Sequence, residues 1–213
     1  HDTIIVVLAQ SGTTIDTNVF AKMAKERGAY TIALVNKKQG DVTFIVDKSF
    51  YLGNGRDVEM SVPSTKTYTC HLVMGYILSE KILNLINKKN DKNFISQSNK
   101  IVNSDFVIKK FNSIKNIVKN INFDIFKYKN WVVLYDDSEN AFAALELRIK
   151  ISECCYKSVP YIHISNFKFK NFKNTLIFYL GTNKINKNVI DKSNFFICIS
   201  KKKSKPHSKN NFC

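Results

Sequence analysis

The chain has 213 residues, 44% of them hydrophobic, and a formal net charge of +16 at pH 7. A chain of this length can bury a sizeable core, in one large domain or two small ones. It contains no run near the roughly eighteen consecutive apolar residues that a transmembrane helix needs, so we expect no membrane association. Because it begins with His1 and leads almost directly into an apolar run, we expect a fragment or a processed piece.

The excess positive charge does not indicate a nucleic-acid-binding surface. Residues 1–80 hold eight basic and eight acidic residues, whereas residues 81–213 hold twenty-five basic and nine acidic residues. The second of these parts also holds 21 of the 24 asparagines, which is typical of nucleotide-composition bias. Arg148 is its single arginine, although arginine is the side chain that recognises phosphates and bases bidentately. We therefore expect no nucleic-acid partner, and a basic nucleic-acid-binding protein is the disfavoured alternative.

Five cysteines are scattered along the chain without a Cys-x-x-Cys pair or a cysteine–histidine cluster. They are Cys70, Cys154, Cys155, Cys198 and Cys213. An odd, scattered set is typical of a reducing compartment, in which thiols behave as small apolar side chains. We therefore expect a cytoplasmic protein that has no metal site and no cofactor.

The first part of the chain predicts strands alternating with helices. Residues 3–9 (TIIVVLA) are a continuous β-branched run, typical of a strand buried on both faces of a parallel sheet. A helix with an apolar stripe follows, and the stripe consists of Val19, Phe20, Met23 and Ala24. Residues 31–35 (TIALV) predict the next parallel strand, and a further short strand is expected in VTFIV or in SFYL. A long helix starts at Ser64.

A second unit of the same kind is expected after a connecting segment. Residues 1–87 form the first predicted domain, and residues 88–128 are a polar, helical connection. Residues 129–200 form the second domain, with strands in NWVVLY, VPYIHI, NTLIFYLG and NFFICIS and a helix in AFAALELRIKISECCYK. Residues 201–213 are a basic tail without apolar periodicity, which predicts disorder.

Two hydroxyl-rich loops stand at expected helix starts. In QSGTT (residues 10–14), hydroxyls, backbone amides and the helix dipole together favour an anion, and Gly12 permits close backbone approach. The alternative is that Ser11 and Thr14 only cap the helix. In EMSVPSTKTYT (residues 59–69), Lys66 opposes the dipole of the second helix unless an anion lies nearby; the alternative is an exposed lysine.

The two loops together resemble the sugar isomerase (SIS) domain family. QSGTTIDT and EMSVPSTKTYT match, in order and spacing, the family patterns SQSGET.DT and E.GVASTKA.T of the isomerase module of glutamine–fructose-6-phosphate aminotransferase. The resemblance covers residues 2 to about 85. It implies two three-layer α/β/α units with parallel sheets, the first without its initial strand–helix unit and the second degenerate or truncated. It also implies that Gln10, Ser11, Gly12 and Thr14 hold a sugar phosphate, while Ser64, Lys66 and the backbone around Val62 close on the sugar.

The predicted helix of the second domain resembles the same family. Residues 144–156 (ALELRIKISECCY) align without a gap with the family helix ALEGALKLKEISY, which puts Glu146, Lys150 and Glu153 in the positions of its catalytic face. Spacings of four and three residues place the three side chains on one helical face. Glu153 would be the base that moves a proton between adjacent sugar carbons, supported by Lys150 and Glu146. The alternative is an ion pair on a solvated helix.

One departure from the family concerns ring opening. The family's ring-opening histidine lies in GELKHGP, and the gap-free match here is SNFKFKN, with Phe169 in the histidine position and His163 six residues before it. A phenyl ring cannot transfer a proton. The resemblance therefore implies binding of a hexose 6-phosphate, fructose 6-phosphate or glucose 6-phosphate, with reduced isomerisation or amination, and a homodimer. A non-catalytic phosphosugar-binding or regulatory module is the alternative, as is the remainder of a truncated gene.

Overall fold

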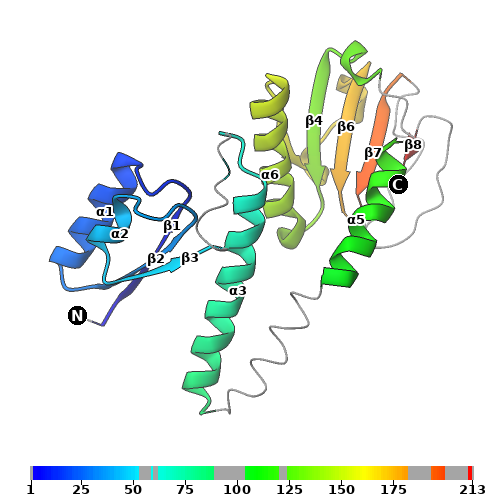
Figure 1. Ribbon diagram of the computed structural model, residues 1–213. Helices are drawn as coiled ribbons and strands as arrows, with labels where there is room; N and C mark the ends of the chain where they lie inside the picture. The colour runs from blue at the N-terminus through cyan, green and yellow to red at the C-terminus, as the bar shows by residue number, and fades with distance from the viewer. Residues whose placement is uncertain are drawn as a thin grey trace. The chain divides into compact units, whose positions relative to one another are not determined.

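The computed structural model (Figure 1) describes residues 2–52, 59, 62–88, 104–119, 124–181, 193–199 and 211–212. The chain divides into two compact units, residues 1–109 and residues 110–213. The boundary between them falls within α5 (Ser104–Lys119), a helix of the segment that we predicted to connect the two domains. The rest of residues 89–123 and most of the predicted tail, residues 201–210 and 213, lie outside the described residues.

The first unit contains a parallel sheet of three strands in the order β1-β2-β3. The strands are β1 (Ile4–Ala9), β2 (Tyr30–Val35) and β3 (Lys48–Tyr51). The helices are α1 (Ile15–Glu26), α2 (Val42–Ile45) and α3 (Lys66–Ile86). The strand expected in VTFIV or SFYL is therefore formed by SFY, and most of VTFIV is helical. The predicted strand–helix–parallel strand order is confirmed.

The core of the first unit lies between the sheet and α1. Alternate residues of β1 and β2 point to the same face of the sheet, as the pleat of a strand requires. They pack with one alanine of α1 and with the residues in and after α2: Val7, Ala9, Ala21, Ala33, Val35, Val42 and Val46. Ala21 is completely buried, and its small side chain allows α1 to lie close against the sheet.

Two predictions of burial in the first unit are wrong. The strand β1 lies at an edge of its described sheet, and Ile4, Val6 and Leu8 on one face are 59%, 41% and 59% exposed. We had expected both faces to be buried. In α1 the stripe that we expected to be buried is open as well, since Val19, Phe20 and Met23 are exposed and Ala21 is the buried residue. The helix meets the sheet along a neighbouring line of positions.

The second unit contains a parallel sheet of five strands in the order β5-β4-β6-β7-β8. The strands are β4 (Asn130–Tyr135), β5 (Tyr161–His163), β6 (Thr175–Leu180), β7 (Phe195–Ile199) and β8 (Asn211–Phe212). The long helix is α6 (Ser138–Cys155), and the short 3-10 helices are η1 (Ile125–Lys127), η2 (Ile164–Asn166) and η3 (Phe169–Asn171). The predicted four strands and helix are confirmed.

Both faces of this second sheet are buried at its centre. Trp131, Val133 and Leu176 pack on one face with Ala144 and Ile151 of α6. On the other face, β4 and β6 pack with residues of the segment after β5, a cluster that includes Val132, Leu134, Phe167, Phe169, Ile177 and Tyr179. The uninterrupted apolar runs of β4 and β6 thus have the two-sided burial that such runs indicate. Among the described residues, no helix is both long and apolar enough to cross a membrane.

Candidate functional site

The first loop, residues 10–14, joins the carboxyl end of β1 to the start of α1. The residues after β2 hold it in place, because Lys37 N donates to Gln10 O (3.0 Å) and Val42 N donates to Gly12 O (2.9 Å). Gly12 has φ +72°, and a Cβ there would lie 3.0 Å from Val42 Cγ1 and 3.1 Å from Gly40 Cα. A glycine is therefore required at this point of the loop.

The hydroxyls of the first loop do not cap α1 in the way that we considered. Ser11 Oγ accepts from Thr13 N (3.2 Å) and lies 2.8 Å from Thr13 Oγ1, so it closes a local turn. Thr14 occupies the N-cap position of α1, but its side chain forms no capping hydrogen bond among the described residues. Thr13 and Thr14 are exposed and Ser11 is half-buried. Hydroxyls and a helix start therefore meet at an accessible position.

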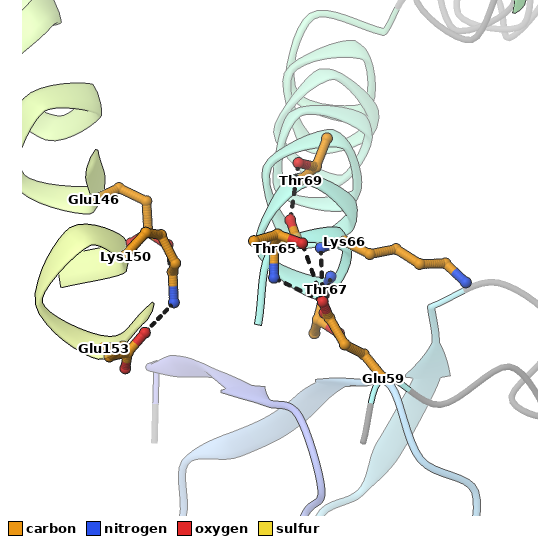
Figure 2. Close-up of polar contacts among 8 residues, drawn as sticks. All are labelled: Glu59, Thr65, Lys66, Thr67, Thr69, Glu146, Lys150 and Glu153. Carbon is orange, nitrogen blue, oxygen red and sulfur yellow. Dashed lines mark hydrogen bonds and ion pairs between the residues drawn. The ribbon is translucent and has the colours of Figure 1, made fainter. Parts of the chain in front are cut away.

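The second loop consists of Glu59 and residues 62–65, directly before α3. Glu59 Oε1 accepts from Thr65 N (2.9 Å), Thr65 Oγ1 (3.1 Å) and Lys66 N (3.3 Å), while Oε2 accepts from Thr67 N (3.0 Å). Figure 2 shows this carboxylate at the first turn of the helix. The amide of Thr65, followed by that of Thr67, lowers the pKa of Glu59 to about 2, because both hydrogen bonds favour the ionised form.

Glu59 places a negative charge at the helix turn that contains Lys66. Its carboxylate accepts from the backbone amides of Lys66 and Thr67, whereas the Lys66 side chain extends away from it (Figure 2). We did not single out Glu59 from the sequence. The available signal was an acidic residue shortly before a predicted helix start, although its partners depend on the path of the chain between Glu59 and Thr65.

The two loops are joined by a hydrogen bond between distant residues. Gln10 Nε2 donates to the backbone carbonyl of Glu59 (3.0 Å), across 49 positions of sequence. In the second loop, Ser64 N donates to Val62 O (2.8 Å), and the Val62 side chain is 84% exposed. The structure thus brings the predicted residues of the first loop together with the loop that contains Ser64, through Gln10 and Glu59.

The three predicted residues of α6 form one group in the second unit. Lys150 Nζ lies 2.8 Å from Glu153 Oε2 and 3.5 Å from Glu146 Oε1 (Figure 2). The side chains of Lys150, Glu146 and Glu153 are 19%, 21% and 32% exposed, so the ion pairs of the alternative interpretation are present and lie at a half-buried position. Burial alone would lower the pKa of Lys150, but hydrogen bonding and attraction from Glu153, with Glu146, raise it overall.

The segment after β5 separates Phe169 from His163. Phe169 is 6% exposed and packs edge-on against Phe167 in the core, at 4.7 Å between ring centroids. His163 ends β5, with Nδ1 2.7 Å from Ser165 Oγ and Nε2 3.1 Å from Asp136 O. These contacts place a histidine, but not Phe169, among polar groups at the carboxyl end of the strands.

A cleft in the first unit lies away from this site. A cleft of about 270 Å³ lies between the amino end of β1 and α1, with Ile5, Phe20 and Met23 in its lining, at the opposite end of β1 from the first loop. No cluster of three or more histidine, cysteine or acidic side chains suited to a metal ion occurs in the part of the chain that the structure describes.

No protein-family model matches this chain, but curated proteins resemble it. The glutamine–fructose-6-phosphate aminotransferase of Fusobacterium nucleatum is 39% identical over 79 residues, which is 37% of this chain and 13% of that protein. The enzyme of the same name from Methanocaldococcus jannaschii is 30% identical over 162 residues, which is 76% of this chain and 14% of that protein. The chain therefore spans only about one seventh of these relatives.

Solved structures share the fold. The C-terminal domain of glucosamine-fructose-6-phosphate aminotransferase from Francisella tularensis superimposes with a TM-score of 0.71 and 20% identity, covering 92% of this chain and 58% of the other. A Clostridium difficile protein assigned as a phosphosugar isomerase gives a TM-score of 0.78 and 20% identity, covering 99% and 62%. The fold is that of sugar isomerase (SIS) domains. Among proteins of this fold, the chain resembles the isomerase module of glutamine–fructose-6-phosphate aminotransferase.

Proposed function

We propose that this chain binds a hexose 6-phosphate, either fructose 6-phosphate or glucose 6-phosphate, through the first loop. The observation that carries the proposal is the meeting of exposed loop hydroxyls with the start of α1, where Thr14 leaves the helix without a cap from its own side chain among the described residues. Backbone amides and the helix dipole at such a position favour a phosphate. The names of the curated relatives, which include fructose 6-phosphate, agree with this ligand.

Each residue of the predicted site has a part in this proposal. The hydroxyls of Ser11 and Thr14 hold the phosphate, and Gly12 allows the backbone to approach it. Gln10 orients the first loop through its bond to Glu59. Ser64 and the backbone of Val62 contact the sugar, with Lys66 beside them. We further propose a homodimer, and the cysteines support a cytoplasmic location, since Cys70, Cys154 and Cys155 are free thiols.

Isomerisation is the second candidate function, and the group on α6 favours it. Glu153 would accept a proton from one sugar carbon and return it to the adjacent carbon, while Lys150, which is also paired with Glu146, holds its carboxylate in place. This step requires the open-chain sugar. Phe169 lies in the core and cannot transfer the proton that ring opening needs. This supports the proposal that the chain binds the sugar phosphate better than it isomerises or aminates it. A non-catalytic regulatory module remains the alternative.

Calorimetric titration tests the binding proposal. We expect fructose 6-phosphate to bind and fructose to bind much more weakly, because the phosphate supplies the charge that the first loop recognises. The double variant Ser11→Ala/Thr14→Val removes two hydrogen bonds to a charged group, which costs about 3 to 6 kcal/mol of binding free energy. The control Ser79→Ala removes a hydroxyl that donates to Gly75 O within α3 (2.6 Å) and should leave the affinity unchanged. Equal affinity for the two sugars would exclude this site.

A further inference from the structure

Glu59 holds both hydroxyl-rich loops at once. Its backbone carbonyl accepts from Gln10 of the first loop (3.0 Å), and its carboxylate accepts from Thr65, Lys66 and Thr67 at the start of α3 (2.9 to 3.3 Å). One residue therefore connects the position of the first loop to that of the second. The function proposed above gives Glu59 no direct contact with the ligand.

The Glu59 carboxylate also fills the place where an anion would bind at α3. The first amides of a helix lack partners within the helix, and together with the dipole they attract negative charge. At α3 the amides of Thr65, Lys66 and Thr67 already donate to Glu59. The pKa of Glu59, lowered to about 2, keeps this carboxylate charged at neutral pH. A phosphate would have to displace it and would meet like charge.

The start of α1 differs from the start of α3 in this respect. Thr14 at the N-cap of α1 makes no side-chain capping bond among the described residues, and the hydroxyls of the first loop lie beside it. The acidic residue in the first turn of α1, Asp16, is exposed, whereas the Glu59 carboxylate receives the first amides of α3. Of the two loops, we therefore infer that the first is the one whose helix start is open to an external anion, although both were expected to favour one.

We propose that Glu59 is a positioning residue of the sugar-phosphate site: it holds the second loop against the first and directs the phosphate to the start of α1. This inference rests on the proposed function and deepens it. The bonds of Glu59 to Thr65 fix the carboxyl end of the turn that contains Val62 and Ser64, in which Ser64 N donates to Val62 O (2.8 Å). Those residues then face the sugar while the first loop holds the phosphate.

The test compares a sugar phosphate with inorganic phosphate as calorimetric ligands of the whole chain. Inorganic phosphate needs the first loop alone, whereas fructose 6-phosphate also needs the second loop in position. We expect Glu59→Ala to weaken fructose 6-phosphate binding by about tenfold, the factor that corresponds to one ordinary hydrogen bond, and not to weaken phosphate binding. Glu59→Gln retains one acceptor and the side-chain shape, so it should recover part of the preference for the sugar phosphate.

Two further variants separate positioning from folding. Gln10→Leu removes the bond to the Glu59 carbonyl but keeps the carboxylate at α3. Like Glu59→Ala, it should lower the ratio of fructose 6-phosphate affinity to phosphate affinity. Glu80→Ala removes a carboxylate further along α3 and should leave the ratio as in the natural chain. General destabilisation would lower both affinities together, and that result would overturn the positioning role.

The outcomes for the natural chain and for the variants are distinct. If the natural chain does not bind fructose 6-phosphate, the proposed function fails, and the inference fails with it. If the natural chain binds but Glu59→Ala and Gln10→Leu keep the same ratio of fructose 6-phosphate to phosphate affinity, only the role of Glu59 is overturned. Hydrogen exchange gives a second measurement, since Glu59→Ala should speed exchange of the Thr65, Lys66 and Thr67 amides.

Discussion

Gly12 and Gly75 are two glycines in opposite environments. Gly12 lies in the first loop with φ +72°, and a Cβ there would press against Val42 and the backbone of Gly40. Gly75 lies within α3, where a Cβ would meet no atom of the described structure within 4 Å. A helical glycine with open space around it loses backbone freedom on folding without gaining contacts. Of these two glycines, only Gly12 is held by its surroundings.

This difference predicts effects of opposite sign for the same substitution. Gly12→Ala should lower the free energy of unfolding by about 1 to 3 kcal/mol, since it strains the backbone and meets fixed atoms. Gly75→Ala should raise it by about 0.5 to 1 kcal/mol through helix propensity. Urea unfolding followed by circular dichroism measures both. A stable Gly12→Ala variant that still binds fructose 6-phosphate would show that the loop does not need its left-handed turn.

At the scale of elements, β1 has one buried and one open face. Val7 is 5% exposed and packs in the core of the first unit, whereas the neighbouring Val6 is 41% exposed on the other face. Among the described residues the strand pairs with β2 alone. Its residues are therefore apolar on both faces, although only one face is buried. The alternation of the two faces comes from the pleat, while their burial comes from the neighbours of the strand.

A matched pair of substitutions tests the two faces of β1. Val7→Thr keeps the shape of the side chain but buries a hydroxyl, which should lower the free energy of unfolding by about 1 to 3 kcal/mol. Val6→Thr places the same hydroxyl in solvent and should change it by less than about 0.5 kcal/mol. Chemical denaturation of both variants against the natural chain gives the values. Similar losses for both would mean that the face with Val6 is covered in solution.

At the scale of the whole molecule, binding and catalysis depend on different parts of the chain. The first loop and Glu59 belong to the first unit, whereas Glu146, Lys150 and Glu153 belong to the second. Ring opening needs a group that transfers a proton, and Phe169 lies in the core of the second unit. Loss of a positioned acid–base group lowers a rate by about a hundredfold to ten-thousandfold.

We therefore expect turnover of fructose 6-phosphate at least about a hundredfold below the ordinary enzymatic rate of roughly ten per second. A coupled assay with ammonia and with glutamine, each offered separately, measures amination, and a second assay measures isomerisation. Glu153→Gln should abolish any residual isomerisation, and Glu139→Gln, on the same helix, should not. Turnover near the ordinary rate would contradict the assignment of Phe169 to the histidine position, and His163 would be the residue to substitute next.

Much of the fold follows from local patterns in the chain. The pleat and the helical repeat are properties of the backbone, so apolar runs predicted β4 and β6, and spacings of four and three placed Glu146, Lys150 and Glu153 on one face of α6. The loop QSGTT between a strand and a helix was likewise readable, because small hydroxylated residues and a glycine are needed at such a turn.

The contacts of these elements with distant parts of the chain could not be predicted in the same way. The carboxylate of Glu59 reaches the first turn of α3, and its carbonyl reaches Gln10 across 49 positions, through a path that no local repeat encodes. The open face of β1 depends on which strands adjoin it, and the burial of Phe169 depends on the packing of the segment after β5. Local periodicity determines which way a side chain points, whereas contacts between distant parts of the chain determine what it meets there.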